Sequence, residues 1–141
     1  MSKYIISIFI IYIFFGFFLF FFQRKILFNC SSTPLGNPFE YGLKDFYEVN
    51  IATSDGVSLI SWYSKAKNNL PTLLYFHGNS YDIGERAHRI KRYTNNGWGV
   101  LIVAWRGYSG NKGKPTESNL YIDAESALNW LKTKALIKKK N

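Results

Sequence analysis

The sequence predicts an α/β fold behind one transmembrane helix, and three observations carry this prediction. Residues 72–76 and 99–104 are short apolar runs, which are typical of buried strands in a parallel sheet. A helical pattern of apolar positions separates the two runs, so together they predict a parallel βαβ unit. The third observation is that residues 4–22 are apolar throughout and contain no charged side chain.

Length and charge limit the classes of protein to consider. A chain of 141 residues allows at most one domain, and about a hundred residues remain for a core once the first quarter is set aside. The net charge is +9, but the charges are scattered except at Lys138, Lys139 and Lys140. Because no nucleic-acid-binding motif accompanies them, we expect no nucleic-acid partner and favour a basic surface beside anionic lipid headgroups.

The apolar stretch at residues 4–22 is predicted to anchor the chain in a lipid bilayer. A helix of this length spans roughly 28 Å, close to the thickness of the hydrocarbon layer. A cleaved signal peptide is the main alternative, but small residues should then follow, and Gln23, Arg24 and Lys25 follow instead. The side of the membrane stays open, because Lys3 flanks one end of the stretch and Arg24 and Lys25 flank the other.

Cys30 is the only cysteine, so no internal disulfide can form. A lipoprotein would require small residues before this cysteine, and Phe28 and Asn29 are not small, so we interpret Cys30 as a free thiol. The predicted organisation is a transmembrane helix at residues 4–22 and a connector at 23–44. An incomplete α/β domain at 45–136 and a basic tail at 137–141 follow.

The first elements of the domain are predicted to be an antiparallel hairpin. Residues 47–53 alternate between polar and apolar positions, and residues 57–64 form the returning strand. Asp55 and Gly56 suit a two-residue turn, because this pair supplies the positive φ that such a turn needs. Residues 66–71 are polar and end in proline, which predicts a loop.

A helix is predicted over residues 83–95, between the two buried strands. Asp82 suits its N-cap, and Glu85 would complete a capping box. Residues 95–97 (NNG) suit its end, because they tolerate the left-handed conformation. The connection between the strands is expected to be right-handed. The apolar face of this helix consists of Ile83, Ala87, Ile90 and Thr94.

Residues 106–115 are rich in glycine and have no periodicity, so they are predicted to form a loop after the second buried strand. A last helix is expected over about residues 117–134, with Thr116 or Ser118 as its cap, and Asp123 is expected on its surface. Its predicted buried stripe consists of Leu120, Ala124, Ala127, Leu128 and Leu131.

Residues 73–80 (LLYFHGNS) and 99–131 (GVLIVAWRGYSGNKGKPTESNLYIDAESALNWL) resemble the amino-terminal part of the α/β-hydrolase superfamily. The branch that they resemble is the membrane-anchored, bud-emergence-like group of serine hydrolases. Upstream, residues 23–28 (QRKILF) and 40–63 (EYGLKDFYEVNIATSDGVSLISWY) are similar to that branch as well. The resemblance covers residues 4–136 and implies a partial α/β-hydrolase sheet made of the hairpin and the βαβ unit.

The resemblance implies a site directly after the first buried strand. His77, Gly78, Asn79 and Ser80 match the oxyanion loop of the family, in which the backbone N–H of Asn79 or Ser80 would donate to a negatively charged oxygen. Such donors are often worth about 3–4 kcal/mol of barrier each. His77 and Gly78 would have structural roles in this loop. Residues 106–110 match the loop that forms part of the pocket rim.

The catalytic groups of the family are not present in the sequence. The nucleophile would lie on G-x-S-x-G, followed by an acid and a base histidine, and none of the three is found. Ser109 lies in G-x-S-G, without the second glycine and on an earlier loop, so we do not assign it as the nucleophile. His88 is expected on a solvated helix face. No catalytic residue, metal site or cofactor is predicted.

The sequence therefore predicts a truncated, membrane-anchored hydrolase-like protein that is inactive by itself. The alternatives are a non-catalytic, membrane-tethered interaction protein or decayed remnant, and one half of a split hydrolase. Because the strand at 72–76 would lack a neighbour, its edge is expected to be exposed, and exposed apolar edges recruit other chains. Self-association or pairing with a second chain at this edge is the partner that we expect.

Overall fold

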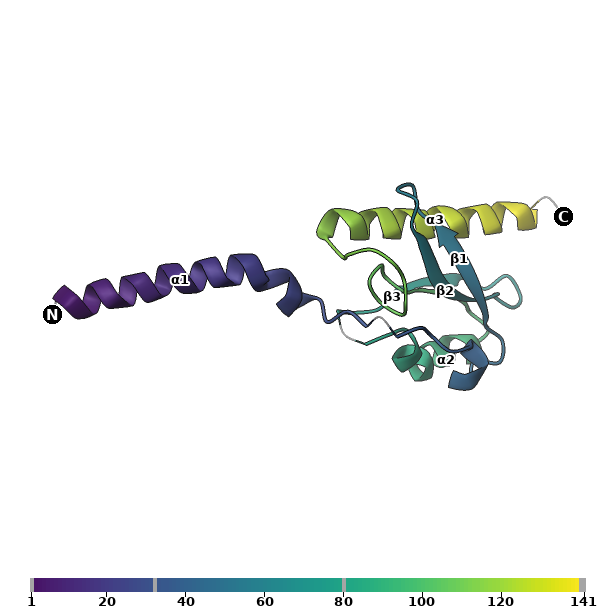
Figure 1. Cartoon of the computed structure of the whole chain (residues 1–141). Helices are drawn as coiled ribbons and strands as arrows, with labels where there is room; N and C mark the ends of the chain where they lie inside the picture. Colours follow the sequence, from purple (N-terminus) through teal and green to yellow (C-terminus); the bar gives the residue numbers. More distant parts are fainter. Residues whose placement is uncertain (1, 32, 80, 140–141) are drawn as a thin grey trace.

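The computed structural model describes residues 2–31, 33–79 and 81–139. Helix α1 (Ser2–Leu27) extends away from the rest of the chain, as Figure 1 shows. Its residues 3–27 are long and apolar enough to cross a membrane, and none of this span is buried against the protein. The helix includes the predicted residues 4–22 and continues past them to Leu27. A short 3₁₀ turn, η1 (Pro38–Tyr41), lies between α1 and the sheet.

The sheet has four strands in the order β1-β2-β4-β3. They are β1 (Tyr47–Ala52), β2 (Ser58–Ser64), β3 (Thr72–Phe76) and β4 (Gly99–Val103). β1 and β2 form the predicted antiparallel hairpin, and β3 and β4 form the predicted parallel pair. β4 also pairs antiparallel with β2, so it joins the two units into one sheet.

The two apolar strands differ in their burial. Every residue of β4 is buried, as predicted. Every residue of β3 is only half-buried, so the prediction of a fully buried strand was wrong for residues 72–76. The reason is the strand order, because within the described chain β3 has a neighbour on one side only. The prediction of an exposed edge on this strand is therefore confirmed for the residues that the structure describes.

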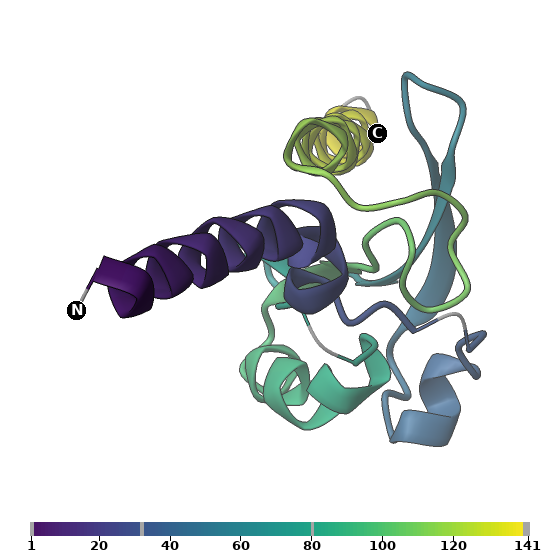
Figure 2. The ribbon, with the colours of Figure 1, turned by 60° about the vertical axis from the view of Figure 1, so that its left-hand side comes forward.

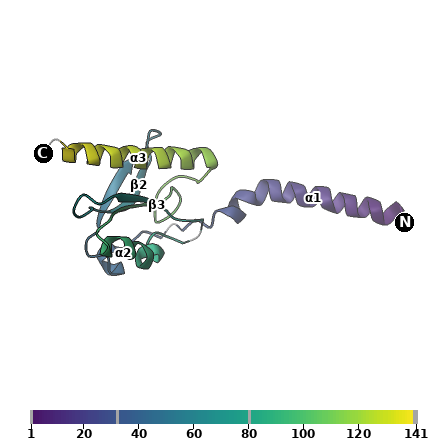
Figure 3. The same ribbon diagram turned by 180° about the vertical axis from the view of Figure 1, so that it is seen from behind.

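One helix covers each face of the sheet, as Figures 2 and 3 show. Along β4, Val100 and Ile102 point to the face covered by α2 (Ala87–Asn95), while Leu101 and Val103 point to the face covered by α3 (Glu117–Lys139). This alternation follows from the two-residue period of a strand. The core therefore consists of two apolar layers that meet at β4.

Helix α2 forms as the sequence predicts, with a 3₁₀ first turn, η2 (Gly84–Arg86). The Asp82 Oδ1 accepts the Glu85 N–H at 3.2 Å, which is one of the two hydrogen bonds of a capping box. Gly97 ends the segment with φ at +83°. The four predicted face residues are all buried: Ile83, Ala87, Ile90 and Thr94.

Helix α3 departs from its prediction in its buried face and in its length. Thr116 caps it as expected, since its Oγ1 accepts the Asn119 N–H at 3.1 Å. Asp123 is fully buried rather than on the surface, and Leu128 is 42% exposed rather than in the buried stripe. The buried face is rotated toward Ala127 and Asp123, because Asp123 pairs with a cation inside the protein. The helix also continues beyond its predicted end, to Lys139.

The turn of the hairpin has three residues rather than the predicted two. The Thr53 N–H donates to the Val57 carbonyl at 2.8 Å and closes the turn over residues 54–56. Only Gly56 has a positive φ, at +84°. This turn leaves the Asp55 side chain able to reach the loop after β4.

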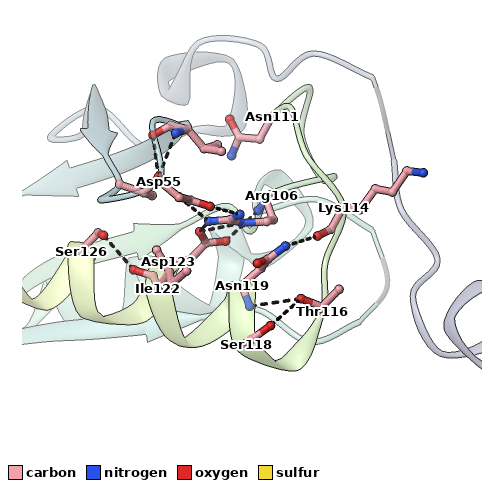
Figure 4. A network of polar contacts seen from close by, with 12 residues as sticks. Asp55, Arg106, Asn111, Lys114, Thr116, Ser118, Asn119, Ile122, Asp123 and Ser126 are labelled. Carbon is pink, nitrogen blue, oxygen red and sulfur yellow. Dashed lines mark hydrogen bonds and ion pairs between the residues drawn. The ribbon is translucent and has the colours of Figure 1, made fainter.

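Arg106 joins the hairpin turn, the loop after β4 and α3, as Figure 4 shows. Its guanidinium is buried and donates from Nε to Asp123 Oδ1 at 2.9 Å and from Nη1 to Asp55 Oδ2 at 2.7 Å. Asp123 Oδ2 also accepts the Arg106 backbone N–H at 3.2 Å. The hydrogen bonds from Arg106 hold the pKa of Asp55 down at about 2. Three segments distant in the sequence are thus held at one buried cation.

We expect Asp123→Ala to lower the free energy of unfolding by roughly 3–5 kcal/mol, because it leaves the buried Arg106 without its fully buried partner. Asp55→Ala should cost less, because Asp55 is partly exposed to solvent. Urea unfolding of the full chain in detergent, followed by tryptophan fluorescence, measures both. Equal losses for the two variants would contradict this account of the network.

Candidate functional site

The candidate site lies where β3 and β4 end. Because the two strands are parallel, the loops that follow them meet at the same edge of the sheet. His77, directly after β3, is buried and its Nε2 accepts the Trp105 N–H at 3.2 Å. The Trp105 Nε1–H donates in turn to the His77 carbonyl at 2.9 Å, and its ring stacks on Phe76 at 4.6 Å. Trp105 therefore fixes both the side chain and the backbone of His77.

Asn79 is held from two other directions. Its carbonyl accepts the Tyr108 hydroxyl at 2.8 Å and the Asn29 N–H at 3.2 Å, and its side-chain amide donates to the Leu27 carbonyl at 2.9 Å. Burial raises the pKa of Tyr108 to about 12, so its hydroxyl remains a donor at neutral pH. The His77 and Asn79 carbonyls are thus both directed into the protein.

The N–H groups of this loop are oriented differently. Among the described residues, neither the Gly78 nor the Asn79 N–H has an acceptor. A Cβ added at Gly78 would meet nothing within 4 Å, so this part of the loop borders open space. Unpaired backbone donors at the end of a strand are the groups that stabilise a negative oxygen in acyl transfer. Ser80, the other predicted donor, lies outside the described residues.

His77 is suited to a structural role. Burial, the larger effect, lowers its pKa to about 4, so the ring is neutral at pH 7. Since Nε2 accepts from Trp105, the proton of the neutral ring lies on Nδ1. His77 therefore cannot take up a proton at neutral pH without losing the bond that positions it.

At residues 106–110 of the loop after β4, which the resemblance assigns to the pocket rim, three side chains are buried. Arg106, Tyr108 and Ser109 are all at most 2% exposed. Ser109 has φ at +56°, and within the described chain its buried Oγ has no hydrogen-bond partner. This serine is enclosed and cannot meet a substrate from solvent. His88 is exposed on α2, as predicted.

The residues that hold the loop were not predicted from the sequence. Trp105, Tyr108 and Asn29 bring the end of β4 and the segment after α1 against residues 77–79. The one signal in the sequence was Trp105, directly after the buried run at residues 99–104, with Tyr108 three residues further on. Nothing in the sequence indicated that Asn29 lies against this loop.

Comparison with known sequences finds relatives among α/β hydrolases, although no protein-family profile matches the chain. The protein Bem46 of Schizosaccharomyces pombe is 32% identical over 124 residues, which cover 81% of this chain and 41% of Bem46. An uncharacterized membrane protein of Saccharomyces cerevisiae is 30% identical over 89 residues, 62% of this chain and 31% of that protein. Lysophosphatidylserine lipase ABHD12 of Xenopus tropicalis is 30% identical over 80 residues, which cover 54% of this chain and 20% of that lipase.

Solved structures show the same fold. The esterase Pf2001 of Pyrococcus furiosus superposes with a TM-score of 0.57 at 20% identity, over 75% of this chain and 41% of the esterase. This chain therefore spans about two fifths of the length of Bem46 and of the esterase. The sheet and its helices correspond to part of an α/β-hydrolase fold, as the sequence predicted.

We expect the chain to lose stability as the pH falls from about 6.5 to about 4, because the lowered pKa of His77 makes the unfolded state take up a proton first. The loss is on the order of 3 kcal/mol, is absent above pH 6.5 and is complete below pH 4. Asp55 acts separately, below pH 3.8. Urea unfolding of the full chain in detergent across this range provides the measurement.

The other histidine of the chain supplies the control for this prediction. His77→Gln should abolish the dependence between pH 6.5 and pH 4, while His88→Gln, on the exposed face of α2, should retain it. An unchanged pH profile in His77→Gln would contradict the assignment.

Proposed function

We propose, from the premise that this chain is a homologue of the Bem46 and ABHD12-type α/β-hydrolase proteins, that it forms the amino-terminal part of a membrane-anchored hydrolase domain. Its contribution is the oxyanion loop at residues 77–80. The observation that carries this proposal is the fixed loop. Its His77 and Asn79 carbonyls accept hydrogen bonds, while the N–H groups of Gly78 and Asn79 have no acceptor among the described residues. A completed site would hydrolyse an ester, thioester or amide through an acyl-enzyme.

In this proposal the Asn79 N–H, with that of Ser80, donates to the oxygen that becomes negative as the carbonyl carbon is attacked. Because Trp105 and Tyr108 fix the loop beforehand, little reorganisation is needed when the charge develops. The attacking group is not among the 141 residues, since none of them lies in G-x-S-x-G. A polypeptide of these residues alone is therefore inactive.

The anchor is α1, and residues 4–22 are its apolar segment. The length and apolarity of the helix support this, as does the relative from Saccharomyces cerevisiae that is named a membrane protein. The connector at 23–44, the domain at 45–136 and the basic tail at 137–141 complete the proposed organisation. A cleaved signal peptide is the competing interpretation, and the mass of the mature protein isolated from membranes distinguishes the two.

The second candidate function is non-catalytic, and the outer edge of β3 favours it. A cavity of about 550 Å³ lies beside this edge, bordered by Leu70, Thr72, Leu128 and Leu131 among others. Leu70 and Leu128 are large apolar side chains exposed to solvent. In both proposals this edge takes a further strand from another polypeptide segment. A second copy of the chain, or the other half of a split hydrolase, would supply it.

The purified 141-residue chain should not be labelled by a fluorophosphonate probe. The one serine on a suggestive motif, Ser109, is fully buried, and its Oγ has no hydrogen-bond partner among the described residues. An active serine esterase serves as the positive control for in-gel fluorescence, and Ser109→Ala should leave the background unchanged. Labelling that disappears in Ser109→Ala would overturn the proposal of an inactive chain.

We also expect the full chain to self-associate in detergent through the edge of β3. Leu70→Lys places a charge beside this edge and should shift the chain toward monomer, because charged side chains on edge strands oppose pairing. Tyr47→Lys, on the opposite edge strand, replaces a similarly exposed apolar residue and should leave the association unchanged. Sedimentation velocity reports the oligomeric state. A wild-type chain that stays monomeric and melts cooperatively would exclude this partner.

A further inference from the structure

Three hydrogen bonds fasten the end of α1 to the loops that follow β3 and β4. Arg24 Nη2 donates to the Pro115 carbonyl at 3.1 Å, and the Asn79 amide donates to the Leu27 carbonyl at 2.9 Å. The third runs from the Asn29 N–H to the Asn79 carbonyl at 3.2 Å. These bonds fix the orientation of α1 relative to the domain. They therefore also determine which face of the domain lies nearest to a membrane that holds α1. That face carries the oxyanion loop, as Figures 1 and 3 show.

The segment after α1 continues along the same face. A Cβ added at Gly107 would lie 3.3 Å from the Cys30 Sγ, and one at Gly110 would lie 3.2 Å from the Pro34 Cα. The segment therefore lies directly against the loop at residues 106–115. These contacts hold this loop close to the point where the chain would leave the bilayer.

Cations gather at this end of the molecule. Arg24 and Lys25 lie in the last turns of α1, and Lys112 and Lys114 are exposed on the loop after β4. Neither Lys112 nor Lys114 forms an ion pair with any residue that the structure describes. The Lys114 side chain extends away from the Arg106 network, as Figure 4 shows. Glu117 is the exposed carboxylate nearest in the sequence, and it accepts the Tyr121 hydroxyl at 3.0 Å.

An aromatic side chain and two carboxylates lie on the other side of the segment after α1. Tyr81 is 63% exposed and borders a polar hollow of about 340 Å³ together with Cys30, Asp82 and Glu85. Because the carboxylates repel an anionic surface, the contact with such a surface falls on the side of Lys112 and Lys114.

We propose that the loop at residues 106–115 rests on the anionic headgroup layer of the bilayer that holds α1, with Lys112 and Lys114 against lipid phosphates. This inference rests on the proposed membrane anchor. Basic residues near such a surface are attracted to it over about one Debye length. The oxyanion loop then opens at the level of the headgroups rather than toward bulk solvent.

The test measures the distance of single labelled positions from the headgroups. The full chain, with Cys30→Ser and a fluorophore on Lys112→Cys, is reconstituted into vesicles of phosphatidylcholine and phosphatidylserine that carry a nitroxide on the headgroup. Lys67→Cys provides the matched position, because it is an exposed lysine at the opposite, amino-terminal end of the parallel strand pair. Quenching should be several-fold stronger at position 112 than at position 67.

Charge is tested in the same vesicles. Lys114→Glu, with the label at position 112, should reduce the quenching several-fold, while Lys65→Glu, beside the distant position, should not change it. Equal quenching at positions 112 and 67 in protein that resists alkaline carbonate extraction overturns this inference alone. Release of the protein by carbonate overturns the anchor and this inference with it.

Discussion

The buried ion pairs of Arg106 are the interaction on which the rest of the structure depends. A guanidinium that is 2% exposed is tolerated only because carboxylates on two different segments neutralise it. Asp55 comes from the hairpin turn and Asp123 from α3, so the cation fixes both relative to the loop after β4. Asn111 adds to this, since it accepts the Ile60 N–H and donates to the Ala104 carbonyl, each at 2.8 Å. The loop is therefore rigid on the side that faces the sheet.

A rigid loop after β4 is what positions the residues after β3. Trp105 immediately precedes Arg106, and Tyr108 lies two residues after it. Trp105 and Tyr108 donate hydrogen bonds to His77 and Asn79. Because the ion pairs of Arg106 fix the loop that carries both donors, they also fix the candidate oxyanion loop. The segment after α1 adds the bonds to Asn79. The apolar helix α1, the salt-bridge network and the candidate site are thereby coupled through a few short contacts.

The elements of this fold could be predicted because their signals are local. The apolar run of β4, the Asp82 cap and the glycine at the end of α2 each depend on neighbouring residues alone. The burial of Asp123 could not be predicted, because periodicity reports apolar positions and Asp123 is buried by a partner seventeen residues away. The candidate oxyanion loop could be assigned only through resemblance to a family, and the contacts that hold residues 77–79 involve Asn29 and Trp105 and are tertiary.

The contacts of the candidate loop also explain why its conformation does not depend on a second neighbour for β3. That strand pairs with β4 alone in the described chain, and its outer edge is open. His77 and Asn79 nevertheless have fixed positions, because their bonds run toward α1 and the loop after β4 rather than toward the open edge. A strand added at that edge would complete the sheet without having to shape the loop. The hydrogen bonds that fix His77 and Asn79 therefore come from this part of the fold and do not require a second neighbour for β3.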